Sequence, residues 1–173
     1  MAWSFGRLKN RLVAKLLTRF PKLLERSVRK VRWTGDSTIP WTPVTKPLPA
    51  SKVAIVTTAG VHLRAQKPFD MSDKMGDPTY RELPLLAKKD EYTITHDYYD
   101  HKDADRDLNI VFPLDRLREL KAAGEIGSLA DVNYGFMGHI DGPHIDTLIK
   151  KTAPEVARKL KMAGVDVALL TPG

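Results

Sequence analysis

Apolar positions recur with helical spacing in the first part of the chain. Within residues 1–32, Leu8, Leu12 and Leu16 follow one another at steps of four, and basic residues keep the same rhythm on another face. This pattern predicts an amphipathic helix, because side chains three or four residues apart share one helical face. Pro21 is expected to open a second helical segment, since proline fits a first helical turn.

The pattern changes after residue 32. Prolines are frequent in residues 33–51, which predicts an extended linker. Beyond it, runs of β-branched and apolar residues predict strands, and residues 64–91 are expected to be mostly loop because prolines and glycines interrupt them. The expected strands are 52–58, 92–96, 109–112, 131–137 and 165–170.

Segments whose apolar residues recur with helical spacing lie between several of these strands. One predicted helix begins at Leu114 and ends at Gly124. Another begins at Ile145, is interrupted by Pro154 and restarts from a capping box formed by Thr152 and Glu155. The alternation predicts an α/β fold for residues 52–173, with a mostly parallel open sheet flanked by helices and preceded by the basic amphipathic helix.

Charge separates the first segment from the rest. Residues 1–32 hold ten basic residues and one acidic residue, a balance of +9, whereas the other 141 residues carry −2. We favour packing of the leucine stripe on the body or on a partner subunit. A helix lying on a membrane surface, with Trp3 and Phe5 as anchors, is a second interpretation. Nucleic-acid binding is not expected, because aromatic residues are not interleaved with the charges.

Composition excludes several classes of chemistry. The chain has no cysteine, which excludes disulfides, cysteine-ligated zinc, iron–sulfur clusters and thiol catalysis by these 173 residues. No apolar run approaches the roughly 18 residues that a membrane span needs. The expected location is cytoplasmic, with membrane association through the basic helix as a further possibility.

The densest polar cluster lies at residues 96–107. His96 and His101 accompany several aspartates, but counting a calcium loop from Asp103 puts Leu108 where glycine is needed. No metal is therefore expected there, and both a hydrogen-bonded loop and a substrate contact stay open. The loop at 138–144 carries further histidines, and a simple turn explains its glycines and proline equally well.

A second candidate region follows the first predicted strand. Thr57, Thr58, Gly60 and His62 lie at or just beyond its carboxyl end. Ligands of open α/β sheets bind outside the carboxyl ends of strands, so this position favours a binding site. No glycine-rich phosphate-binding motif occurs in the chain.

Several stretches together resemble the selenoprotein B family of glycine, betaine, sarcosine and D-proline reductases. The resemblance covers roughly residues 52–173, and the long stretch at 99–120 is its most specific part. The matching stretches are GVHL at 60–63, FDM at 69–71, GDPTYREL at 76–83, YDHKDADRDLNIVFPLDRLREL at 99–120, GEIGSLAD at 124–131 and VALLTPG at 167–173.

The resemblance implies an oxidoreductase subunit that reductively cleaves a C–N bond of a small amine or betaine substrate. It implies other reductase subunits and a dithiol donor as partners, and a pyruvoyl group on a partner subunit. The family's selenocysteine or cysteine is expected just after Gly173. We therefore expect that the chain stops at a misread selenocysteine codon, binds no cofactor and is inactive by itself. The alternative is a non-catalytic binding or scaffold module that docks to a partner or a membrane surface through the basic helix.

The matched stretches also suggest site residues. His62, His96 and His101 are expected to share a pocket near the end of the last strand, where histidines can orient or protonate a substrate carboxylate or amine. The expected substrate-binding residues are Thr57, Thr58, Gly60, Asp100, Thr171 and Gly173.

Overall fold

The computed structural model describes residues 5–28 and 42–173, and these divide into two compact units. The first, which we call the N-terminal unit, comprises residues 1–45 together with 97–100. The second, which we call the α/β unit, comprises residues 46–96 and 101–173.

Two helices form most of the described N-terminal unit. Helix α1 spans Phe5–Arg19 and α2 spans Pro21–Val28. The predicted amphipathic helix is therefore confirmed, and Pro21 opens the second segment as expected, because proline lacks only an N–H that a first turn does not use. Trp3 and residues 29–41 lie outside the described residues. The described end of the predicted linker contains a short 3-10 turn at Leu48–Ala50.

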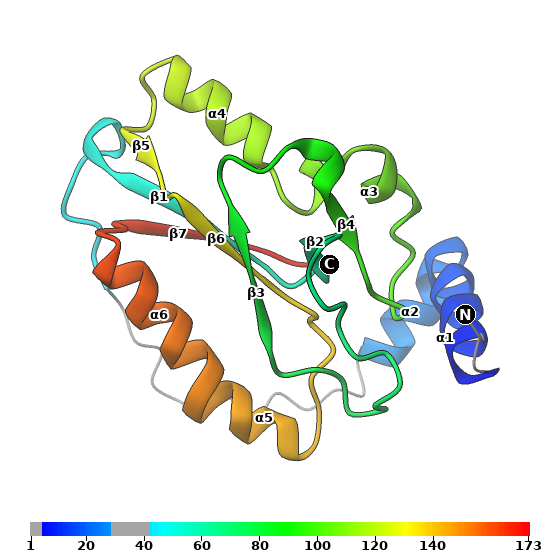
Figure 1. The fold of residues 1–173 in the computed structure, drawn as a ribbon. Coiled ribbons are helices and arrows are strands. Elements are labelled where there is room, and N and C mark those ends of the chain that lie inside the picture. The colour runs from blue at the N-terminus through cyan, green and yellow to red at the C-terminus, as the bar shows by residue number, and fades with distance from the viewer. Residues whose placement is uncertain (1–4, 29–41) are drawn as a thin grey trace. The chain divides into compact units, whose positions relative to one another are not determined.

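A five-stranded sheet, counted over the described residues, forms the centre of the α/β unit (Figure 1). The central strand β1 is parallel to β6 on one side and to β7 on the other, and its first residues pair with β5. Strand β3 adds an antiparallel edge to β6. The prediction of an α/β fold with a mostly parallel sheet is confirmed. The strands are β1 (Lys52–Thr57), β3 (Tyr80–Pro84), β5 (Ser128–Leu129), β6 (Val132–Phe136) and β7 (Val167–Thr171).

Helices cover both faces of this sheet because the connections cross it in opposite directions. The chain passes from β1 to β6 on one side and then returns across β1 to β7. Right-handed crossovers therefore place α4 (Leu114–Ala122) and α6 (Ala153–Met162) on opposite faces, and α5 (Pro143–Thr147) lies on the α6 side (Figure 1).

Strand β1 is buried on both faces. Ala54 belongs to the core cluster under α6, together with Tyr134 and Phe136 of β6. Ile55 alternates with Ala54 and therefore faces the other side, where it is fully buried. Its N–H donates to the side-chain carbonyl of Asn133 at 2.7 Å, which satisfies the backbone where β5 and β6 interrupt the ladder.

A second, two-stranded sheet pairs β2 (Val61–Leu63) with β4 (Tyr92–Ile94) in antiparallel register. It is followed by α3 (Lys102–Arg106) and by a 3-10 turn at Leu108–Ile110. Strand β2 passes close to β6, because a Cβ added at Gly135 would lie 2.3 Å from the Val61 carbonyl oxygen.

Residues 64–91 are mostly loop, as predicted, and they also contain strand β3, which was not predicted. Two local predictions were wrong. Residues 109–112 contain a 3-10 turn in place of a strand. The predicted break at Pro154 is also absent: a π-helical turn at Leu148–Thr152 joins α5 to α6, and Pro154 occupies the first turn of α6. The Thr152 hydroxyl is buried without a hydrogen-bond partner among the described residues, so no capping box forms.

Candidate functional site

The carboxyl ends of β1, β6 and β7 lie along one edge of the sheet, because these strands run parallel. Thr57 ends β1 and Thr171 ends β7, and their hydroxyls both donate to the carbonyl oxygen of Val111, at 2.8 and 2.7 Å. The N–H of Thr58 donates to the Thr171 carbonyl at 2.9 Å. Three of the expected binding residues are thereby joined at one point, which we call the strand-end edge.

Two glycines let the loops beyond these strands pass close together. Gly60 has a φ of +74°, and its N–H donates to the Phe136 carbonyl at the end of β6. Gly138 has a φ of +89°, and a Cβ added there would lie 2.3 Å from the Thr58 carbonyl oxygen. Glycine is required at both positions, because a side chain would clash with backbone and because L residues rarely adopt a positive φ.

His62 lies on β2, immediately beyond the strand-end edge, and is 2% exposed. Its Nδ1 lies 2.7 Å from the Leu63 carbonyl oxygen and its Nε2 lies 2.8 Å from the Thr95 hydroxyl. Since a carbonyl only accepts, Nδ1 carries the proton and Nε2 accepts from Thr95. Burial lowers the pKa of His62, against the opposing effect of the Leu63 carbonyl. The ring is therefore a neutral, fully hydrogen-bonded group that positions β2.

The other two candidate histidines lie on different elements. His96 is buried beside Gly60, where a Cβ added to the glycine would lie 3.2 Å from the His96 Cβ. His101 precedes α3, and its Nδ1 lies 2.8 Å from an Asp105 carboxylate oxygen. Asp100 belongs to the N-terminal unit. Gly173 lies two residues beyond the last residue of β7 and is exposed.

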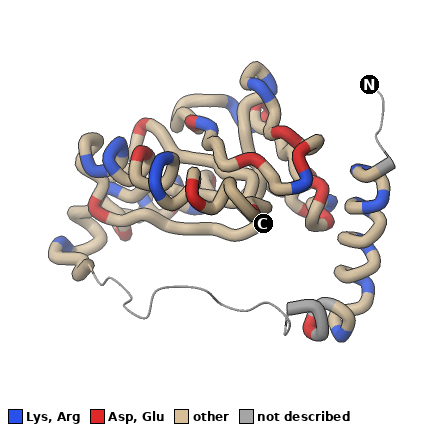
Figure 2. Tube along the Cα trace, turned by 90° about the horizontal axis from the view of Figure 1, so that it is seen from below, with Lys and Arg blue, Asp and Glu red and all other residues tan. Residues whose placement is uncertain are grey.

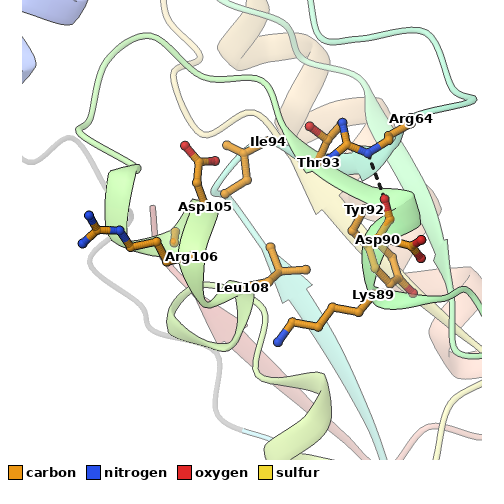
Figure 3. Close-up of a pocket in the computed structure, with 10 residues that line it drawn as sticks. Arg64, Lys89, Asp90, Tyr92, Thr93, Ile94, Asp105, Arg106 and Leu108 are labelled. Carbon is orange, nitrogen blue, oxygen red and sulfur yellow. Dashed lines mark hydrogen bonds between the residues drawn. The ribbon is translucent and has the colours of Figure 1, made fainter.

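An open hollow of about 480 Å³ lies between β4 and the segment containing α3 (Figure 3). Its lining combines apolar side chains with charges of both signs, and it includes Asp105, the partner of His101. Sequence reasoning missed this hollow, because its residues come from three separate segments, at 64, 89–94 and 104–108. The lining residues are Arg64, Lys89, Asp90, Tyr92, Thr93, Ile94, Ala104, Asp105, Arg106 and Leu108.

A second open hollow, of about 490 Å³, lies between residues 67–81 and the loop at 138–144. In its wall, Asp73 pairs with His144 at 2.9 Å. Asp77, which is nearly buried, accepts hydrogen bonds from Thr79. Burial raises the pKa of Asp77, but the hydrogen bonds and the nearby Arg81 outweigh this and lower it. His144 and His139, whose Nε2 lies 3.0 Å from the Lys74 carbonyl oxygen, therefore link this loop to residues 73–74.

Two classes of feature are absent from the described residues. Within residues 5–28 and 42–173, no three His, Asp or Glu side chains gather closely enough to hold a metal ion. Over the same ranges, no helix combines the length and the apolarity that crossing a membrane would require.

Comparison with known protein families identifies the family of this chain. The family model of glycine/sarcosine/betaine reductase selenoprotein B matches residues 25–173, which include the whole strand-end edge. The chain belongs to the selenoprotein B family. The resemblance inferred from the sequence is therefore confirmed.

Curated relatives carry matching names. D-proline reductase subunit gamma of Acetoanaerobium sticklandii is 44% identical over 133 residues, which cover 77% of this chain and 53% of the relative. Glycine reductase complex component B subunit gamma of Carboxydothermus hydrogenoformans is 29% identical over 137 residues, covering 77% and 30%. Sarcosine reductase complex component B subunit beta of Peptoclostridium acidaminophilum is 29% identical over 140 residues, with the same coverage.

These matches cover only part of each relative. The chain spans about half the length of the D-proline reductase subunit and about a third of the other two relatives. Helix α1 lies outside the part that matches the family model. No solved structure shows a significant match to the chain.

Proposed function

We propose that this chain forms part of a selenoprotein B-type reductase subunit that cleaves a C–N bond of a small amine or betaine substrate. The observation that carries the proposal is the convergence of β1, β6 and β7 at the strand-end edge, inside the matched residues. Open α/β sheets bind ligands at such an edge. The names of the curated relatives supply the substrate class: D-proline, glycine and sarcosine.

The proposed reaction is a two-electron reduction. The C–N bond breaks, the carbon and the nitrogen each gain a hydrogen, and a dithiol donor is oxidised to a disulfide. The nitrogen becomes a free amine, which stays in the product when the substrate is a ring such as D-proline. A selenol or thiol following Gly173 would supply the nucleophile, and a pyruvoyl group on another subunit would activate amine substrates. The strand-end edge suits such a group, because Thr171 leads out of β7 beside Thr58.

The residues of this chain would bind and orient the substrate. In this proposal Thr58 and Thr171, which are partly exposed, line the approach to the reacting carbon. Thr57 and Gly60 are buried and hydrogen-bonded, and they hold the strand ends behind that approach. His62 holds β2 in place through its two occupied nitrogens. His96 and His101, with Asp100 and Gly173, remain candidates for contact with the substrate.

The charged side chains that line the hollow in Figure 3 suit a zwitterionic substrate. Arg64 and Lys89 carry positive charge at its rim, whereas Asp105 carries negative charge beside His101. An amino acid would offer a carboxylate to Arg64 or to Lys89 and a cationic nitrogen to Asp105. Tyr92 and Leu108 add apolar surface for the carbon skeleton.

One observation favours the alternative of a non-catalytic module. The 173 residues contain no cysteine, so they hold no thiol that could take part in the dithiol couple. In this alternative the family fold is kept for binding a partner, and the strand-end edge carries no reaction.

Amide NMR shifts distinguish the two functions. The ¹⁵N-labelled full chain is titrated with glycine, sarcosine, betaine and D-proline, and we expect one of them to shift amides within 57–62, 92–106 or 171–173. His101→Gln should weaken that binding at least threefold, whereas Lys161→Gln, on the exposed side of α6, should not. Reductase subunits identified by mass spectrometry in the complex purified from its source would support the proposed partners. Absence of both binding and such subunits would favour the non-catalytic module.

A further inference from the structure

Helix α1 exposes a stripe of leucines. Leu8, Leu12 and Leu16 are 46%, 58% and 49% exposed. Phe20, between α1 and α2, and Leu23 of α2 are exposed as well. Contiguous exposed apolar surface of this kind usually marks a contact site, because leaving it in water is unfavourable.

The opposite side of α1 is the one that packs. Ala14 is 5% exposed, and Arg7 forms a two-pronged ion pair with the buried carboxylate of Asp97, at 2.5 and 3.3 Å. At 100° per residue, Arg7 and Ala14 lie about 20° apart around the helix, whereas Leu12 lies about 160° from Ala14. Within the N-terminal unit, the helix is therefore held by one side and presents the leucines on the other.

Cations surround the leucine stripe. Lys9 and Lys15 lie about 60° to either side of Leu12, and Arg19 lies about 20° from it, one turn beyond Leu16. All three are exposed. Helix α1 contains no acidic residue, and Figure 2 shows Lys and Arg distributed along its length. Long basic side chains beside an apolar stripe can keep their charges at the polar surface while the stripe enters an apolar phase.

We propose that α1 binds the surface of an anionic lipid bilayer, with Leu8, Leu12 and Leu16 inserted and Lys9, Lys15 and Arg19 among the headgroups. Charge complementarity favours lipid over a protein partner, because cations border the stripe on both sides without an acidic residue in the helix to specify an orientation. The location of α1 outside the family match also separates it from surfaces shared with subunits of reductase complexes. Such binding is peripheral and reversible.

Vesicle sedimentation tests the proposal on the full chain. We expect it to sediment with vesicles of phosphatidylglycerol and phosphatidylcholine, at least tenfold more strongly than with phosphatidylcholine alone, and to be released by high salt. The double variant Leu12→Glu, Leu16→Glu should lose at least tenfold in binding. Leu86→Glu is the matched control, because Leu86 is 92% exposed in the α/β unit, and it should bind like the wild type.

Lys9→Gln, Lys15→Gln and Arg19→Gln together should weaken binding to anionic vesicles and reduce its salt dependence. Circular dichroism of each variant shows whether the helices persist. Equal binding to neutral and anionic vesicles, or no vesicle binding by the wild type, would overturn the proposal. The proposal would also be overturned if the double leucine variant still bound vesicles but no longer assembled into the purified reductase complex, because α1 would then dock to protein. These results do not depend on the amide shifts that test the proposed function.

Discussion

Strand β1 and helix α1 are both rich in aliphatic residues, yet those of β1 are buried and those of α1 are largely exposed. Val53, Ala54 and Ile55 of β1 are at most 5% exposed, whereas Leu8 and Leu12 of α1 are about half exposed. Strand β1 has paired neighbours at both edges and helices over both faces. In the described part of the N-terminal unit, α1 is held on the side of Arg7 and Ala14. The comparison teaches that an apolar pattern specifies an element, and that its neighbours decide whether the pattern forms core or contact surface.

The largest expected effect compares one residue from each region. Ile55→Ala should lower the free energy of unfolding by about 2–5 kcal/mol, because Ile55 is fully buried and the substitution leaves a cavity. Leu12→Ala should change it by less than about 0.5 kcal/mol, because Leu12 is exposed. Urea denaturation at pH 7 measures both. Equal losses for the two variants would show that the leucine stripe also forms core.

The second prediction concerns backbone crowding at the strand-end edge. Gly138→Ala should cost about 1–3 kcal/mol more than Gly124→Ala in the free energy of unfolding. Both glycines have a positive φ, so both variants bear the same backbone strain. Only Gly138 faces the Thr58 carbonyl, whereas a Cβ at Gly124 meets nothing within 4 Å. Thermal or urea unfolding of the pair measures the difference, and equal costs would argue against close packing of these loops.

The third prediction is a pH dependence from His62. The pKa of His62 is about 6.5 in the unfolded chain, and burial lowers it in the folded protein. Below about pH 6.5 the unfolded chain therefore binds a proton at His62 that the folded protein does not bind. Stability should therefore fall as the pH drops below about 6.5, until the pH reaches the lowered pKa of the folded state. One proton contributes at most about 1.4 kcal/mol per pH unit.

Urea denaturation between pH 7 and 5 measures this slope, and His62→Gln should flatten it. A slope that the substitution leaves unchanged would contradict the account of His62 as a neutral structural histidine.

The smallest expected effect concerns the attachment of α1. Arg7→Gln should cost about 0.2–1 kcal/mol, because Arg7 is itself 38% exposed and solvent screens the ion pair. Amide hydrogen exchange should accelerate in residues 97–100, where Asp97 loses its guanidinium partner. Lys22→Gln, an exposed cation of α2, is the control and should leave exchange there unchanged. Unchanged exchange in Arg7→Gln would mean that the ion pair does not hold α1.

The sequence determined the elements that depend on local pattern. Leucines four residues apart predicted α1, and the β-branched run at 52–58 predicted β1 with an error of one residue. Strands β6 and β7 and helix α4 were found in the same way. Long motifs, above all residues 99–120, also identified the family, because motif identity does not require knowledge of contacts.

Only the tertiary structure decided the remaining features, because they depend on residues far apart in sequence. Strand β3 has no strong alternating pattern and exists through its pairing with β6 some fifty residues later. The hollow of Figure 3 is assembled from separate segments, and no local signal marks it. The side chain of His62 was visible in the sequence as a candidate, but its occupied nitrogens depend on a partner 33 residues away, Thr95. Local periodicity in the sequence shows which face of a helix or strand is apolar. Contacts between distant segments decide which residues that face, and the polar residues beside it, pack against.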